Sequence, residues 1–339
     1  MFVTGSEKSN ACAILEPCKE QTHCVIRATD NEFVPVRHYR RAKPLESGAR
    51  VALISPAGPL QKPEELSRAQ ENARALGWEP IVFPHARDKV GYLAGNDRDR
   101  LSDINAALRD PTIDGLWCLR GGYGMIRILA GIDYEALSNT PKPVMGYSDI
   151  TALHAAVQRK CAVVTYHGPT AREPLSDFSR LSFERAVIGQ TDSCGTAPEA
   201  REINPGTAEG RLVGGNLAVL ASLCGTPFMP DLTDGILILE DIGEAVYRID
   251  RMLEQLKLSG ALNGCKAIAF GACVKCPDDA GGGGRPFDQV LGEIARSFNI
   301  PCIAGIPVGH IDEQWTIPLG ATATLDTKTS TLNVTSYTS

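Results

Sequence analysis

Residues 144–156 read VMGYSDITALHAA, and this stretch decides the fold. It begins with the end of an apolar strand, turns at Gly146 and continues into an amphipathic helix. The apolar residues of that helix repeat at helical spacing: Ile150, Leu153 and Val157. The stretch therefore predicts a strand that passes directly into a helix, with Ser148 and Asp149 at the junction.

Similar units precede this stretch. Apolar runs that end in proline or glycine alternate with helical patterns: VALISPAG (51–58), a helix over 63–77, PIVFP (80–84), a helix over 100–110 and GLWCLRGGYG (115–124). This alternation predicts an α/β fold with a mainly parallel sheet. In such sheets sites form at the carboxyl ends of the strands, where RGGYG (120–124) and GYSD (146–149) both lie.

Four regions of the chain differ in their patterns. Residues 1–44, with the basic run Arg37–Lys43, show little periodicity and are expected to be a loosely structured extension. Residues 45–190 carry the strand and helix units of the predicted α/β domain. Residues 191–209 are rich in Thr, Pro, Gly and Glu, which favours a linker. Residues 210–339 end in short apolar runs without helices between them, which predicts a smaller, β-rich C-terminal domain.

Composition excludes several classes of protein. The net charge of −6 shows no basic excess, so a nucleic-acid partner is not expected. No apolar run approaches the roughly 20 residues of a membrane span, so a membrane partner is not expected either. The first residues lack the apolar core of a signal peptide, and we expect a cytoplasmic protein.

The 11 cysteines are scattered and odd in number, which favours mostly reduced thiols. Cys273 and Cys276 form a C-x-x-C after an apolar run, and we interpret them as a strand end and a loop rather than a redox or metal site. Three cysteines near the start are evenly spaced, beside His23: Cys12, Cys18 and Cys24. No further ligand completes them at a recognised spacing, so we expect no metal and no cofactor.

Ser148 has two interpretations of similar weight. A serine between a strand and a helix occupies the position of a nucleophile elbow, where free N–H groups and the helix dipole favour a developing oxyanion. Ser-Asp is also a common helix N-cap. The stretch lacks the second glycine of G-x-S-x-G, because position 150 is isoleucine.

A nucleophilic serine needs a base and an orienting carboxylate. His310 and His167 both follow apolar strands, and either position suits a base. Glu240 follows four apolar residues in GILILEDIGE, and a carboxylate at the exit of a buried strand needs a partner. Asp241 competes for that role. The glycine pair of RGGYG is compatible with an oxyanion hole, an anion site or a tight turn.

Together these pieces resemble the LD-carboxypeptidase family (muramoyltetrapeptide carboxypeptidases), which includes the microcin C immunity peptidases. The resemblance begins near Leu45 and extends along nearly the whole remaining chain. The blocks that carry it occur in the family's order: ISPAGP, LRGGYG, KPVMGYSDITALH, YHGP, GRLVGGNLAVLASLCGTPF, ILILEDIGEAVYRIDRMLEQLKLSG and VGHIDEQWTIPLG.

The resemblance assigns roles to particular residues. It implies a serine peptidase with a catalytic triad of Ser148, Glu240 and His310. It also implies an oxyanion hole formed by the backbone N–H groups of Asp149 and of Gly121 or Gly122. The implied fold is an N-terminal domain similar to class I glutamine amidotransferases and a C-terminal β-rich domain. The family usually forms homodimers.

The resemblance further implies a small peptide substrate, a murein tetrapeptide that loses its terminal D-alanine during cell-wall recycling. We expect substrate contacts from Arg120, Tyr123 and Trp315, and Arg248 is a second candidate to hold the substrate carboxylate. The alternative is a microcin-type peptidase that cleaves an aminoacyl or peptidyl nucleotide amide, which an aromatic side chain at Trp315 would favour. A non-catalytic binding protein of the same fold is the third hypothesis.

Overall fold

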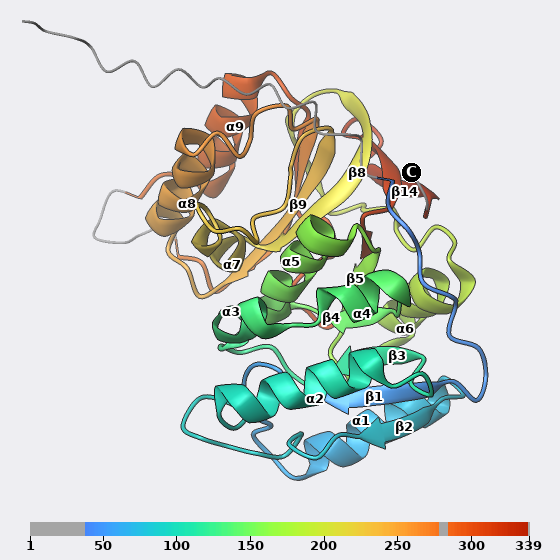
Figure 1. Ribbon diagram of the computed structural model, residues 1–339. Coiled ribbons are helices and arrows are strands. Elements are labelled where there is room, and N and C mark those ends of the chain that lie inside the picture. Colours follow the sequence, from blue (N-terminus) through green and yellow to red (C-terminus); the bar gives the residue numbers. More distant parts are fainter. Residues whose placement is uncertain (1–37, 278–283, 338–339) are drawn as a thin grey trace, which may run out of the picture. The chain divides into compact units, whose positions relative to one another are not determined.

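Two β-sheets organise the residues that a computed structural model describes, which are 38–277 and 284–337 (Figure 1). One sheet has six strands in the order β12-β5-β4-β3-β1-β2. The other has eight strands in the order β6-β14-β13-β8-β9-β10-β11-β7. No helix in the described ranges has the length and apolar character that a membrane span requires.

The first sheet is parallel except at one edge. It consists of β1 (Arg50–Ile54), β2 (Glu79–Val82), β3 (Gly115–Cys118), β4 (Val144–Gly146), β5 (Thr165–His167) and β12 (Ile317–Leu319). Only β12 runs antiparallel to its neighbour, β5. The accompanying helices are α1 (Glu64–Ala75), α2 (Asp97–Arg109), α3 (Met125–Ile128), α4 (Tyr134–Asn139), α5 (Thr151–Cys161) and α6 (Asp177–Glu184), with the short turns η1 (Leu129–Gly131), η2 (Ser148–Ile150) and η3 (Arg185–Gly189).

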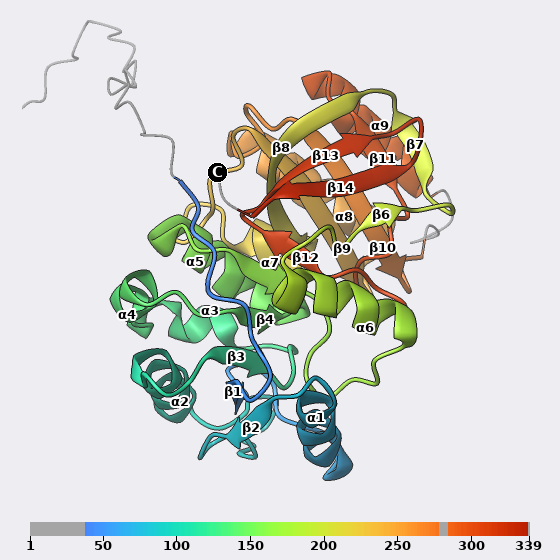
Figure 2. The same ribbon diagram turned by 90° about the vertical axis from the view of Figure 1, so that its right-hand side faces the viewer.

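Both faces of this sheet are covered, and β1 shows why. Successive side chains of a strand point to opposite faces. Val51 and Leu53 belong to a core with α1 and α6, whereas Ala52 and Ile54 belong to a core with α2, α4 and α5. Figure 2 shows α1 and α6 on one side of the sheet and α2 and α4 on the other. Burial on both faces explains the continuous apolar run of this strand.

The second sheet combines four parallel strands with antiparallel strands at both ends. Its strands are β6 (Gly195–Thr196), β7 (Arg201–Asn204), β8 (Thr207–Asn216), β9 (Gly235–Ile242), β10 (Ala267–Val274), β11 (Cys302–Ala304), β13 (Thr322–Asp326) and β14 (Thr331–Ser336). The helices α7 (Leu217–Ser222), α8 (Val246–Leu258) and α9 (Phe287–Phe298) share one apolar core with β9 and β10. Figure 1 shows these three helices together beside β9.

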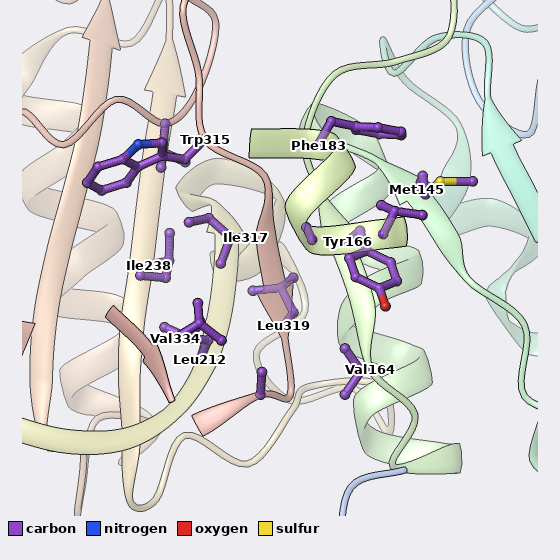
Figure 3. Packing of buried hydrophobic residues seen from close by; sticks show 14 of the residues in the cluster. Met145, Val164, Tyr166, Phe183, Leu212, Ile238, Trp315, Ile317, Leu319 and Val334 are labelled. Atoms are coloured by element: carbon purple, nitrogen blue, oxygen red, sulfur yellow. The ribbon is translucent and has the colours of Figure 1, made fainter. Parts of the chain in front are cut away.

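Apolar side chains from the two sheets meet in one core. Met145 and Tyr166 from the first sheet belong to the same buried cluster as Leu212 and Ile238 from the second (Figure 3). Burying apolar area contributes about 25 cal/mol per Å² removed from water, so this shared core favours docking of the two sheets. The docking fixes β4, which leads to Ser148, relative to β9, which carries Glu240.

Three features differ from the sequence-based expectations. The segment 191–209, interpreted as a linker, instead supplies β6, β7 and the start of β8 to the second sheet. The strand β12, from the region assigned to the C-terminal domain, completes the first sheet. Within the expected extension, Tyr39 is buried, and the backbone N–H of Arg40 donates to Ala162 O at 2.9 Å, so the chain joins the fold before residue 45.

Candidate active site

Ser148 lies where β4 ends and η2 begins, with a backbone φ of +64°. Residues other than glycine rarely adopt this left-handed conformation, and such strain is concentrated at functional sites. The side chain is partly exposed. No side chain caps η2 or α5, so the N-cap interpretation of Ser148 and Asp149 is wrong for the helix that follows them. The geometry is that of a nucleophile elbow.

The glycine turn after β3 packs directly against this serine. A Cβ atom built on Gly121 would lie 2.8 Å from Ser148 Cβ and 3.0 Å from Ser148 Oγ. The carbonyl of Gly121 accepts a hydrogen bond from Gly58 N–H at 2.8 Å, which fixes the turn. Glycine at position 121 thus allows backbone groups to approach the hydroxyl closely.

Asp149 and Arg100 hold the far end of the same turn. Asp149 is buried, and its Oδ2 accepts from Met125 N–H at 2.8 Å. Arg100 is buried and donates through Nη1 to Gly124 O at 2.9 Å and to Pro56 O at 2.6 Å. Burial raises the pKa of Asp149 to about 6, although N–H groups of the turn and the charge of Arg100 oppose this shift. Because Met125 is the first residue of α3, its hydrogen bond to Asp149 means that the side chain of Asp149 caps this helix.

Glu240 and His310 form a hydrogen-bonded pair. Glu240 Oε2 lies 2.8 Å from His310 Nδ1, and Glu240 is completely buried near the end of β9. Gly309 has a φ of +119°, and a Cβ there would lie 2.9 Å from Glu240 Oε2, so the loop can approach the carboxylate only with glycine at this position. Burial lowers the pKa of His310, but the hydrogen bond and the negative charge of Glu240 outweigh this effect and raise it.

Tyr147 lies between Ser148 and the Glu240–His310 pair. Its ring centroid lies 4.8 Å from that of His310, and it is the residue directly before Ser148. Within residues 38–277 and 284–337, His310 hydrogen-bonds to Glu240, while Ser148 Oγ makes no hydrogen bond. Catalytic hydrogen bonds are often long in the absence of substrate and tighten when it binds.

The structure separates the competing candidates that sequence patterns left open. His167 is completely buried, and burial lowers its pKa well below the usual value, so it is poorly placed to accept a proton from a bound substrate or from Ser148. Asp241 Oδ2 accepts from Ala218 N–H at 2.9 Å at the start of α7, which is a structural role. Arg248, the second candidate for the substrate carboxylate, instead pairs with Glu244 at 3.3 Å on the surface of the molecule.

The expected substrate contacts differ in accessibility. Tyr123 is 47% exposed and meets Tyr92 edge-on, with ring centroids 5.6 Å apart. Arg120 is partly buried, donates to Pro59 O at 2.6 Å and has no carboxylate at ion-pair distance among the described residues. Trp315 was expected to face the substrate, but it is only 2% exposed and packs in the core near Ile238 and Ile317 (Figure 3). That expectation was wrong because Trp315, in the irregular segment just before β12, is buried in the core that the two sheets share.

Two features of the cysteines and of the possible metal ligands were not anticipated from the sequence. Cys273, in β10, and Cys276, just after it, form a disulfide, which the interpretation as a strand end and a loop did not anticipate. The trio Cys12, Cys18 and Cys24 and the neighbouring His23 lie outside the described residues. Sequence patterns did not single out the grouping of His85, Asp88 and Asp99, whose ligand atoms lie within 4.8 Å of one another.

This arrangement of a strained serine, a close glycine turn and a carboxylate–histidine pair is compatible with a hydrolase. Family models identify it further: residues 51–168 match the LD-carboxypeptidase N-terminal domain, and residues 209–325 match the LD-carboxypeptidase C-terminal domain. The chain belongs to the LD-carboxypeptidase family, and it is a peptidase.

Individual relatives match most of this chain. A probable murein peptide carboxypeptidase from Bacillus subtilis is 36% identical, and the match covers 86% of this chain and 93% of the relative. The microcin C7 self-immunity protein MccF from Escherichia coli is 26% identical over 88% of this chain and 96% of its own length. The crystal structure of a muramoyltetrapeptide carboxypeptidase from Oxalobacter formigenes is 32% identical and superposes with a TM-score of 0.74, covering 84% of this chain and 98% of that one.

Proposed function

We propose that this protein is a serine LD-carboxypeptidase that releases the terminal D-alanine of a murein tetrapeptide. One observation carries the proposal: His310 is hydrogen-bonded to the buried Glu240 and lies against Tyr147, the residue before Ser148. The identity to a probable murein peptide carboxypeptidase supports the choice of substrate. The expectations of a cytoplasmic homodimer are part of the same proposal, and cell fractionation and light scattering test them.

In the proposed mechanism, His310 accepts the proton of Ser148 as its Oγ attacks the carbonyl of the scissile amide. Glu240 holds the imidazole through Nδ1 and stabilises the imidazolium that forms. The backbone N–H of Asp149 and one from Gly121 or Gly122 bind the oxyanion, and each such donor contributes on the order of 10²–10³ in rate. His310 then donates its proton to the departing D-alanine, and water hydrolyses the acyl-enzyme by the same route.

The test measures D-alanine release from murein tetrapeptide by the full-length protein and by Ser148→Ala. We expect the variant to lose nearly all activity, whereas Ser102→Ala, an exposed serine on α2, serves as the matched control and stays active. Activity in the presence of EDTA is expected to be unchanged. Full activity of Ser148→Ala would refute the proposed triad.

A microcin-type activity is the alternative, supported by the similarity to MccF. Burial of Trp315 removes the aromatic side chain that favoured a nucleotide substrate. Cleavage of an aminoacyl sulfamoyl adenylate without any release of D-alanine would nevertheless establish this alternative. A purely ligand-binding protein would cleave neither compound.

A further inference from the structure

A pocket of about 480 Å³ opens beside His310. Tyr147 and His310 form one part of its wall, so it adjoins the proposed catalytic residues. Glu173 and the loop with Asp312 also line it. Ser179 fixes this loop, because its Oγ donates to Asp312 O at 2.9 Å and accepts from Gln314 N–H at 2.9 Å. The wall of the pocket is therefore preorganised.

The pocket is acidic. Glu173 and Asp312 both line it, whereas no lysine or arginine is among its lining residues. Glu173 Oε1 accepts from Tyr147 Oη at 2.9 Å, which orients the carboxylate. Arg172 lies 3.9 Å from Glu173 but 2.6 Å from Glu65, so its charge is shared between two carboxylates. Burial raises the pKa of Glu173, as expected for a carboxylate with incomplete compensation.

The charge of the pocket indicates which end of a peptide it accepts. The residue that a carboxypeptidase releases carries a free carboxylate, and two carboxylates in the pocket would repel it. An ammonium group on the acyl side of the scissile bond would instead form charge-assisted hydrogen bonds there. We propose that the pocket of Glu173 and Asp312 binds the side-chain ammonium of a diamino acid on the acyl side of the scissile amide. This assignment rests on the proposed carboxypeptidase function.

The test compares two tetrapeptides that differ only in the residue before the terminal D-alanine, which is L-lysine in one and L-norleucine in the other. The wild-type protein is expected to show a kcat/KM for the lysine peptide that is higher on the order of tenfold. Glu173→Gln and Asp312→Asn should each reduce this preference. Glu313→Gln is the matched control, because Glu313 is exposed and does not line the pocket.

The ratio of kcat/KM between the lysine and norleucine peptides is more informative than the kcat/KM of either peptide alone. Glu173→Gln also removes a negative charge that acts on His310, but both peptides meet the same imidazole, so their ratio isolates the pocket. Binding of both peptides to Ser148→Ala, measured by calorimetry, gives the same comparison without turnover and should also favour lysine. A second lysine peptide with an acetylated side chain should behave like the norleucine peptide.

The possible outcomes distinguish the two proposals. Equal kcat/KM values for the two peptides in the wild type, or a preference that survives in both pocket variants, would overturn the pocket assignment and leave the carboxypeptidase function intact. Absence of D-alanine release from every peptide would refute the proposed function. In that case, equal binding of the two peptides to Ser148→Ala would overturn the ammonium site as well, whereas tighter binding of the lysine peptide would support it.

Discussion

The carboxylate of Asp149 accepts a hydrogen bond from the backbone N–H of Met125 at 2.8 Å. This contact ties the residue after Ser148 to the first turn of α3, directly beyond the glycine turn. Asp149 thus has two separate functions in the proposed site. Its backbone N–H is a proposed oxyanion donor, while its side chain fixes the position of the second donor.

Asp149→Asn is expected to change the pH dependence of stability. Burial raises the pKa of this carboxyl from 3.8 to about 6 in the folded state. The free energy of unfolding of the wild type therefore falls as pH rises through that range. The asparagine variant lacks this loss. Its unfolding free energy relative to wild type should therefore rise by about 2 kcal/mol between pH 4.5 and 7.5, as measured by urea denaturation.

Asp110→Asn provides a control of opposite sign. Hydrogen bonds from Thr112 lower the pKa of this exposed carboxyl, so its contribution to stability is lost as pH falls. The Asp110→Asn variant should not gain stability relative to wild type as pH rises. A parallel pH dependence of Asp149→Asn and wild type would show that Asp149 is not a perturbed, buried carboxyl.

Gly121→Ala is expected to lower kcat/KM by about 10² or more without unfolding the protein, because the new Cβ would lie 2.8 Å from Ser148 Cβ and would displace the turn. Steady-state kinetics and circular dichroism measure the two quantities. Gly189→Ala is the control, since a Cβ there meets neighbours at 3.4 Å or more. Equal activity of both variants would remove the glycine turn from the proposed mechanism.

The pH profile should report the His310–Glu240 pair. A general base acts in its neutral form, and the pKa of His310 is raised above 6.5, so kcat/KM should rise with a midpoint above pH 6.5. In Glu240→Gln the negative charge is lost, and the midpoint should move to lower pH while the maximal rate falls. An unchanged midpoint in this variant would exclude Glu240 as the partner of the titrating group.

Trp315→Ala should act on stability and not on substrate choice. The side chain is 2% exposed in the core between the sheets, and loss of a buried tryptophan costs about 3–5 kcal/mol. Trp315→Phe should recover part of this loss, and both variants should keep the ratio of kcat/KM between different substrates. Tyr123→Ala, at an exposed position, should leave the unfolding free energy nearly unchanged. If Trp315→Ala changed the ratio of kcat/KM between substrates and left the unfolding free energy unchanged, Trp315 would have to be assigned to the substrate site after all.

The sequence alone predicts the local units well, since periodicity and turn residues act over short distances. The strand, turn and helix around Ser148 follow from the pattern of residues 144–156. Pairings between distant segments leave no such local signal. The strand pair β5–β12 joins residues about 150 positions apart, and its three-residue strands are too short for a periodic pattern.

Local patterns also fail where burial is decided by distant partners. Trp315 lies beside the family's GH block, and only the packing of both sheets shows that it faces inward. The helix α9 lies between β10 and β11, where the sequence patterns predicted short apolar runs without helices between them. Similarly, the polar composition of residues 191–209 favoured a linker, although β7 is an edge strand, where exposed polar residues are tolerated.

The pairing of β12 with β5 has a consequence for synthesis of the protein in the cell. The outer edge of β5 stays unpaired until residues 317–319 have left the ribosome, because no earlier segment of the described chain occupies that edge. The sheet that supports Ser148 therefore lacks its outer strand until residues 317–319 have been synthesised. A nascent chain that already contains Ser148, Glu240 and His310 would still lack β12, the strand that covers this edge of the sheet.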